Sequence, residues 1–153
     1  MKIDLGCGSY PRGDIGVTMH IDGVVCEATK HLDKYLAEFG FVYNPNATVI
    51  DDDIVRYCEY HQDEFVNHSI LLCHVIEHLE CPYYLLTLLR KAKDIVVVVP
   101  NARVNDADKI DRTHIYSFTE WSLYNLIKKA FGVEPTYRKI EYEQDLLAYV
   151  FLN

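Results

Sequence analysis

An acidic residue and two glycines near the start of the chain have the spacing of a nucleotide-type cofactor site. Asp4, Gly6 and Gly8 close a short apolar run, and a second apolar run ends at Asp22 and Gly23. The glycines let the backbone turn sharply after a strand and let a ligand approach where a Cβ would block it. An Asp at the end of the next strand can accept hydrogen bonds from ribose hydroxyls. Position 11 is Pro, and no glycine falls three residues after Gly8, so the dinucleotide fingerprint, and with it a nicotinamide oxidoreductase, is disfavoured.

Imidazole groups further along the chain could act on a bound substrate. His74, Glu77 and His78 follow an apolar segment, and His114 lies in a polar one. A His side chain is neutral for a good part of the time at pH 7, so we predict that His78 and His114 are the catalytic bases. For Glu77 the favoured interpretation is an acid in the first turn of a helix.

The spacing of these residues also raises the question of a metal. On a helix, His74, Glu77 and His78 would share one face and could bind zinc, manganese or magnesium. His74 is expected to end a strand instead, which breaks the shared face, and we therefore predict no metal site.

Strand and helix patterns alternate along the chain. The predicted strands are Lys2–Leu5, Val17–Ile21, Thr48–Ile50, Ser69–Cys73 and Asp94–Val99, and the predicted helices are His31–Phe39, Ile54–Phe65, Pro82–Lys93 and Thr119–Phe131. The tail from Thr136 to Asn153 indicates two strands joined near Glu143–Asp145. This order predicts an α/β fold: a doubly wound, mostly parallel sheet with a C-terminal antiparallel hairpin, in one domain over residues 1–153.

One helix is missing from this pattern. The segment between the glycine turn and the second strand contains Pro11, Gly13 and Gly16, and it is too short and too broken for a helix. We expect a thin cover over the cofactor on that side, or a partner subunit that supplies the missing layer. A homodimer is one such arrangement.

The composition of the chain limits which substrates and which cellular environment it suits. The net charge is -8, which suits a long phosphate backbone poorly, so a nucleic-acid substrate is disfavoured. The five cysteines are odd in number and show no CxxC spacing, which indicates a reducing cytoplasm. No apolar run reaches the roughly 20 residues of a membrane span.

Four motifs in the same order resemble those of the class I S-adenosylmethionine (SAM)-dependent methyltransferases, and the resemblance covers nearly the whole chain. They are the glycine turn Asp4-Leu5-Gly6-Cys7-Gly8, the run Val75-Ile76-Glu77-His78-Leu79 after the fourth strand, Pro100-Asn101 after the fifth, and His114 before Tyr116-Ser117. The resemblance implies a Rossmann-like methyltransferase fold with SAM as cofactor. Some relatives with the Glu-His pair use a metal there, with a Glu at the position of His74.

The resemblance also assigns roles to residues. Asp4, Gly6 and Gly8 would meet the methionine end of SAM, Asp22 the ribose, and Asp51 or Asp52 the adenine amine. Asp51, Asp52 and Asp53 could equally be the cap and first-turn acids of the next helix. The full cofactor-binding set is Asp4, Gly6, Cys7, Gly8, Asp22, Gly23, Asp51, Asp52 and His74, in which Cys7 is interpreted as a packing residue rather than a nucleophile.

The function that this resemblance implies is methyl transfer from SAM to a small-molecule or protein acceptor. The Asn/Asp-Pro-Pro-Tyr/Phe motif of nucleic-acid amino-methyltransferases is absent, because Cys73-His74-Val75-Ile76 stands in its place. Two alternatives stay open: a non-catalytic SAM- or nucleotide-binding subunit that needs a partner, and a nucleic-acid methyltransferase.

Overall fold

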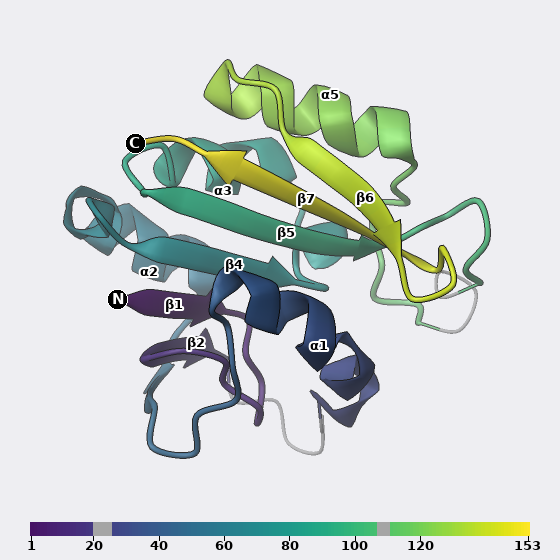
Figure 1. Ribbon diagram of the computed structural model, residues 1–153. Helices are drawn as coiled ribbons and strands as arrows, with labels where there is room; N and C mark the ends of the chain where they lie inside the picture. Colours follow the sequence, from purple (N-terminus) through teal and green to yellow (C-terminus); the bar gives the residue numbers. More distant parts are fainter. Residues whose placement is uncertain (20–25, 107–110) are drawn as a thin grey trace.

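A seven-stranded sheet forms the centre of the computed structural model, which describes residues 1–19, 26–106 and 111–153 (Figure 1). Its strand order is β3-β2-β1-β4-β5-β7-β6. The first five strands are parallel, and β7 runs antiparallel between β5 and β6. The strands are β1 Lys2–Leu5, β2 Ile15–Thr18, β3 Thr48–Asp51, β4 Ser69–Cys73, β5 Asp94–Pro100, β6 Thr136–Ile140 and β7 Asp145–Phe151. The predicted doubly wound sheet with a C-terminal hairpin is confirmed.

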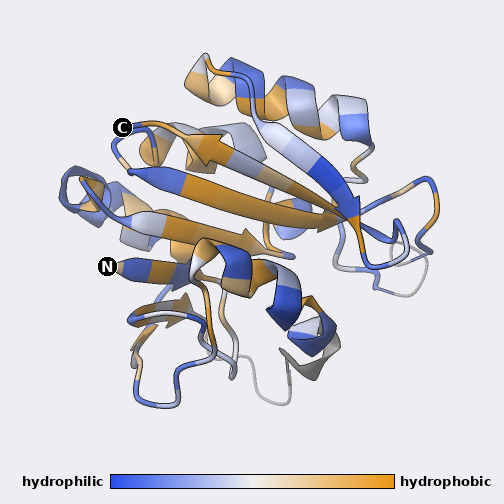
Figure 2. Ribbon diagram, viewed as in Figure 1, coloured by the Kyte–Doolittle hydropathy of each residue, from blue (hydrophilic) through white to orange (hydrophobic). Residues whose placement is uncertain are grey.

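Central and edge strands differ in burial. Every residue of β4 and β5 is buried, because helices cover both faces of these strands. Figure 2 shows the corresponding hydrophobic run through β5. By contrast, β3 at the edge is mostly exposed, which explains why its sequence carries a weaker apolar signal.

Three α-helices pack on one face of the sheet, and three short helical pieces pack on the other. The first group is α2 Ile54–His61, α3 Pro82–Leu88 and α5 Glu120–Phe131, with the short 3-10 helices η3 Gln62–Phe65 and η4 Ile76–His78 in the connections. The second group is η1 Cys26–Leu32, α1 Asp33–Leu36 and η2 Ala37–Phe39. α5 begins at the predicted N-cap Thr119 and ends at Gly132, whose left-handed backbone stops the helix. Among the described residues, no helix has the length and apolar character that crossing a membrane requires.

Several boundaries differ from the sequence-based prediction. β2 begins at Ile15 rather than Val17, because Ile15 already pairs with β1 and with β3, and it ends at Thr18. Residues 20 and 21 of the predicted strand lie outside the described residues. The helix predicted over 82–93 ends at Leu88, and a turn leads from there into β5. The helix predicted over 31–39 consists mostly of 3-10 turns.

The face that lacks the first helix is covered by the segment after β2. No helix lies between β1 and β2, as predicted. Leu32, Leu36 and Phe41 pack instead against β4, β5 and β7, and Phe39 stacks on Tyr149 with ring centroids 5.0 Å apart. The centre of the sheet therefore has a packed layer on both faces, and the thin cover expected over the cofactor stays a prediction.

A buried arginine joins the glycine turn to this covering segment. The backbone N–H of Arg12 donates to Asp4 Oδ2 (2.8 Å). Its side chain donates from Nε to Asp33 Oδ1 (2.8 Å) and from Nη2 to the carbonyl oxygen of Thr29 (2.9 Å). The hydroxyl of Tyr10 donates to the other oxygen of Asp33 (2.8 Å). Arg12 therefore connects the loop that replaces the helix to the segment that takes its place.

We predict that Arg12→Met lowers the free energy of unfolding by about 2–3 kcal/mol, because it removes the charge-assisted pair of a buried arginine with Asp33 and the hydrogen bond to the Thr29 carbonyl. Urea unfolding measures the change. The control is Arg138→Met, which breaks an exposed pair with Glu38 (side chains 43% and 53% exposed) and should change stability little. Equal effects of the two substitutions would contradict the role assigned to Arg12.

Candidate functional site

The glycine turn after β1 has a left-handed backbone, which glycine adopts without strain. Gly6 has φ +87° and Gly8 has φ +55°, and the Gly6 N–H donates to the Val17 carbonyl (2.7 Å). A Cβ on Gly6 would lie 2.4 Å from Cγ2 of Val75. The turn therefore contacts the residue that immediately follows His74. The glycine turn and the segment after β4 therefore lie side by side at one edge of the sheet.

Two of the predicted cofactor residues in this region are buried in the scaffold. Cys7 is buried, and a Cβ on Gly16 would lie 2.6 Å from its Sγ, which agrees with the packing interpretation. Asp4 is 1% exposed and accepts the Arg12 N–H. Burial raises the pKa of Asp4 to about 7, although the hydrogen bond and charge of Arg12 act in the opposite direction.

The predicted ribose and adenine residues lie on the β2–β3 side. Asp22 and Gly23 fall outside the described residues, and their roles stay predictions. Asp51 is exposed at the end of β3. Asp52 accepts the backbone N–H of Asp53 (2.8 Å), and its own N–H donates to the carbonyl of the last β2 residue. Of the three acids, Asp53 is the one that caps α2, so the capping alternative does not account for Asp51 or Asp52.

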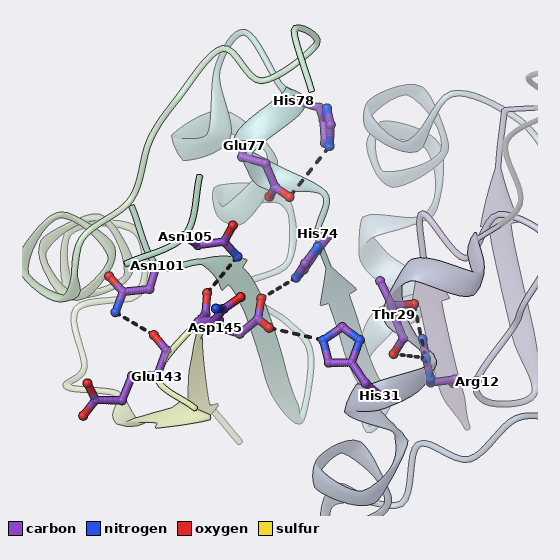
Figure 3. Close-up of polar contacts among 11 residues, drawn as sticks. Arg12, Thr29, His31, His74, Glu77, His78, Asn101, Asn105, Glu143 and Asp145 are labelled. Atoms are coloured by element: carbon purple, nitrogen blue, oxygen red, sulfur yellow. Dashed lines mark hydrogen bonds and ion pairs between the residues drawn. The ribbon is translucent and has the colours of Figure 1, made fainter. Parts of the chain in front are cut away.

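His74 is the first residue after β4, and it contacts Asp145. Its Nε2 lies 2.7 Å from Oδ1 of Asp145, the first residue of β7. The other oxygen of Asp145 lies 3.4 Å from Nε2 of His31 (Figure 3). Burial lowers the pKa of His74, but the hydrogen bond to Asp145 and the charges of Glu77 and Asp145 raise it, and the net shift is upward. A direct contact between His74 and the cofactor stays a prediction.

The two predicted catalytic histidines are brought together. The rings of His78 and His114 meet edge to face with centroids 4.5 Å apart. The backbone N–H groups of Ile115 and Tyr116 donate to the Glu77 carbonyl (2.8 and 3.1 Å), so the loop that carries His114 is fixed to η4. A sequence separation of this size gives no sign of the contact, which depends on how the loop after β5 folds back.

The tautomer of His78 follows from its neighbour. The hydroxyl of Thr113 donates to Asp111 Oδ1 (2.6 Å), and the same oxygen lies 2.9 Å from His78 Nδ1. A hydroxyl has one hydrogen, so toward His78 it accepts, and Nδ1 carries the proton. In the neutral ring, Nε2 therefore has a lone pair. Burial and the neighbouring His114 lower the pKa of His78, which favours that neutral form.

Glu77 completes the cluster in a way that its sequence position did not indicate. It lies in the first turn of η4, as expected, but it is 1% exposed, so it is not a solvated helix acid. Both of its carboxylate oxygens are buried without a hydrogen-bond partner. Burial raises its pKa to about 7, against the opposing charges of His74 and His114. An unpartnered buried carboxylate is costly, and native proteins rarely keep one without a ligand or a catalytic role.

Three ligand atoms from Glu77, His78 and His114 lie within 4.8 Å of one another. This is not the set considered from sequence, because His74 has turned to Asp145 and His114 takes its place. One carboxylate and two imidazoles suit zinc, manganese or magnesium. His78 Nε2 faces Glu77 Oε1 at 3.7 Å. A nitrogen lone pair and a carboxylate oxygen repel each other at this distance unless a proton or a cation lies between them.

Asn101 secures the far side of the site. It is buried after β5, its N–H donates to the Gln144 carbonyl (2.8 Å), and its Nδ2 donates to the Glu143 carbonyl (2.9 Å). The β6–β7 turn is thereby held beside the end of β5, which places Asp145 next to His74. Sequence analysis missed Asp145 and His31, because the strand pairing that aligns them is not visible in the sequence.

The architecture has clear relatives among solved structures. A scan against protein-family models and a search of the curated proteins find no match. The small RNA methyltransferase HEN1 matches with a TM-score of 0.63 and 18% identity, over 99% of this chain and 23% of that one. A putative methyltransferase from Haloferax volcanii, solved in complex with the Trm112 activator, matches with a TM-score of 0.61 and 9% identity, over 99% and 81% of the two chains.

The N-terminal domain of EvdMO1, solved with S-adenosylhomocysteine (SAH) bound, matches with a TM-score of 0.59 and 12% identity, over 99% of this chain and 74% of that one. The chain has the fold of the class I SAM-dependent methyltransferases. In this methyltransferase fold, parallel strands direct their carboxyl ends to one edge of the sheet, where ligands bind. The glycine turn, His74 and the Glu77/His78/His114 cluster all lie at that edge.

The raised pKa of Asp4 predicts that the stability of the protein depends on pH. This pKa is raised from 3.8 to about 7 in the folded state. Between these two values the folded protein holds a proton that the unfolded chain releases, so stability falls as pH rises, by up to about 1.4 kcal/mol per pH unit. Asp4→Asn should remove this slope, measured by urea unfolding at about pH 5 and pH 7.

Glu77 contributes a slope of the same sign, so part of the pH dependence should persist in the Asp4→Asn variant. The matched control is Asp63→Asn, which changes an exposed acid (80% exposed). A slope that is the same in Asp4→Asn and in the wild type would show that Asp4 is ionised in the folded protein at both pH values.

Proposed function

We propose that the protein is a SAM-dependent methyltransferase that acts on a small-molecule or protein acceptor. The observation that carries the proposal is the meeting of His78 and His114 beside the buried Glu77, next to the glycine turn, at the ligand edge of a methyltransferase fold. Two structures with this fold, the EvdMO1 N-terminal domain and a magnesium protoporphyrin IX methyltransferase, contain SAH, which supports SAM as the cofactor.

The cofactor would lie along the ends of β1, β2 and β3. The backbone of Gly6, Cys7 and Gly8 would approach its methionine end, and Asp4 would hold the turn in shape through Arg12. Asp22 and Gly23 would meet the ribose, and Asp51 or Asp52 the adenine amine. This order along the edge matches the order of the strands in the sheet.

Methyl transfer then needs the acceptor atom on the far side of the methyl group. The acceptor attacks the methyl carbon in line, the carbon–sulfur bond breaks, and sulfur keeps the electron pair. Where the acceptor still carries a proton, Nε2 of His78 is the group to receive it, because Nδ1 is already protonated through Thr113. The ring of His114 packs against the ring of His78 and restricts the orientations that the His78 side chain can adopt.

We predict that His78→Ala and His114→Ala each leave SAM affinity near normal and reduce turnover by about 10²–10⁴-fold. Affinity is measured by calorimetry. Turnover is measured as tritium transferred from methyl-labelled SAM to a panel of alcohols, amines, carboxylic acids and peptides. His61→Ala, an exposed histidine on α2 that pairs with Glu64, is the matched control. Full activity in either variant would show that the substituted histidine is not catalytic and has a structural role.

A second candidate arrangement has a divalent cation in the cluster. The unpartnered oxygens of Glu77 and the lone pair of His78 Nε2 favour it, in disagreement with the sequence-based prediction of no metal. A cation held by Glu77, His78 and His114 would bind the oxygen or nitrogen of the acceptor and make it a better nucleophile.

The cation is tested by titrating the chelator-treated full chain with Mn²⁺, Mg²⁺ and Zn²⁺ in a calorimeter. One-to-one binding that Glu77→Gln weakens at least about tenfold supports the site. Glu64→Gln, which alters an exposed His–Glu pair, should leave the binding unchanged. If none of the three ions binds the wild-type protein, the carboxylate is neutralised by a proton and the direct His78 mechanism is retained.

A non-catalytic or partner-dependent subunit is the alternative from another class. One methyltransferase of this fold was solved in complex with the activator Trm112, so dependence on a partner has a precedent in the fold. SAM binding without methyl transfer to any acceptor in the panel would favour this alternative. A homodimer and a cytoplasmic location stay predictions, and a nucleic-acid acceptor stays disfavoured by the net charge of -8.

A further inference from the structure

A buried carboxylate between two imidazoles is left unexplained by the proposed chemistry. Asp145 is 2% exposed, and it pairs in the sheet with Pro100, the last residue of β5. Its two oxygens are directed to different histidines, Oδ1 to His74 Nε2 (2.7 Å) and Oδ2 to His31 Nε2 (3.4 Å). Burying a carboxylate costs free energy unless charged or hydrogen-bonding partners offset the cost. Here the offsetting partners are imidazoles rather than a lysine or arginine.

The backbone at His74 is strained where its side chain makes this contact. His74 has φ +56°, a left-handed conformation that is unfavourable for a non-glycine residue. Its N–H is held by the Val98 carbonyl (2.9 Å), so the chain cannot relax without leaving the sheet. Glycine or asparagine would occupy such a turn at less cost. Strain of this kind, retained at the edge where ligands bind, indicates a functional side chain.

The ring of His74 contacts one buried carboxylate directly. Nε2 lies 2.7 Å from Oδ1 of Asp145, while neither oxygen of Glu77 accepts a hydrogen bond (Figure 3). Nδ1 is therefore not bonded to Glu77, and the His74 side chain is 23% exposed at the edge. A buried carboxylate bonded to one ring nitrogen favours the protonated imidazole, and a cationic ring can only donate from its second nitrogen.

We propose that His74 determines acceptor specificity by donating a hydrogen bond from Nδ1 to an anionic oxygen of the methyl acceptor, a carboxylate or a phosphate, and that Asp145 is the positioning residue that holds it. A charged donor pairs most strongly with a charged oxygen, and partial burial strengthens the pair. His31 fixes the second oxygen of Asp145 from the opposite side. The inference rests on the proposed methyltransferase function, because it names the acceptor class for that same site.

Nuclear magnetic resonance of the histidine rings tests the proposal without a known acceptor. The full chain, labelled with ¹⁵N in its histidines and saturated with SAH, is titrated with sodium acetate and, separately, with sodium phosphate at constant ionic strength. His74→Gln identifies the signals of His74. The titratable groups that face this ring are Glu77, Asp145 and the more distant Arg12, and His31 faces the other oxygen of Asp145.

The expected result is a His74 ring with both nitrogens protonated at neutral pH and a saturable shift of its Nδ1 signal. Acetate alone producing the shift identifies a carboxylate acceptor, and phosphate alone a phosphorylated one. Asp145→Asn should convert His74 to the neutral ring and weaken anion binding at least about fivefold. Asp94→Asn, a buried strand acid that begins β5 at the opposite edge, should change affinity less than about twofold and controls for general loss of packing.

Three results would overturn the proposal: a neutral His74 in the wild-type protein, an anion shift that Asp145→Asn leaves unchanged, or a protonated His74 that neither anion perturbs. Failure of SAH to bind is a separate result, seen by calorimetry before the titration, and it would count against the methyltransferase function itself. The anion titration is then run on the protein without SAH, where the same three results still overturn the His74 assignment.

Discussion

The short connection between β1 and β2 is the constraint on which the rest of this structure depends. Residues 6–14 must turn, pass Pro11 and enter β2 at Ile15, which leaves no room for a helix. The apolar face of β4, β5 and β7 still has to be covered, and the 26–39 segment crosses it instead. The buried Arg12 stabilises this arrangement, because its N–H binds Asp4 beside the glycine turn and its side chain binds Asp33 in the crossing segment. Hydrogen bonds of one residue therefore connect the glycine turn to the segment that covers the sheet.

The crossing segment also brings polar groups to the functional edge. His31 lies in η1 and reaches Asp145, which in turn holds His74. The loop after β5 brings His114 against His78, and Glu77 is buried beside them. Four histidines and two buried carboxylates thus gather where the parallel strands end. Their environments shift the pKa of His74 upward and that of His78 downward, the directions that suit the roles proposed for them, a charged donor and a neutral base.

The parts of the fold that the sequence predicted are those that local patterns control. β4 and the run through β5 are continuous apolar segments, and α5 has a Thr cap and a Gly stop, so their positions follow from neighbours in the chain. His78 and His114 were each predicted as catalytic residues, but the contact between their rings was not predicted. Asp145 and the burial of Glu77 were not predicted either, because both depend on which residues of the hairpin and loop face the end of β4. The left-handed turn at His74 is likewise set by its contact with Asp145, and no local signal in the sequence indicates it.

The proposed function requires that the protein bind SAM at the carboxyl edge of its parallel strands. Titration of the purified full chain with SAM and with SAH by calorimetry, with NAD as the control, measures this in one experiment. One-to-one binding of both sulfur compounds and none of NAD is the predicted result, and Asp22→Ala should weaken it by about 1–3 kcal/mol through loss of the ribose contact. Binding of neither compound would contradict the account, because the glycine turn, with its crossing segment in place of a helix, would then serve the fold alone.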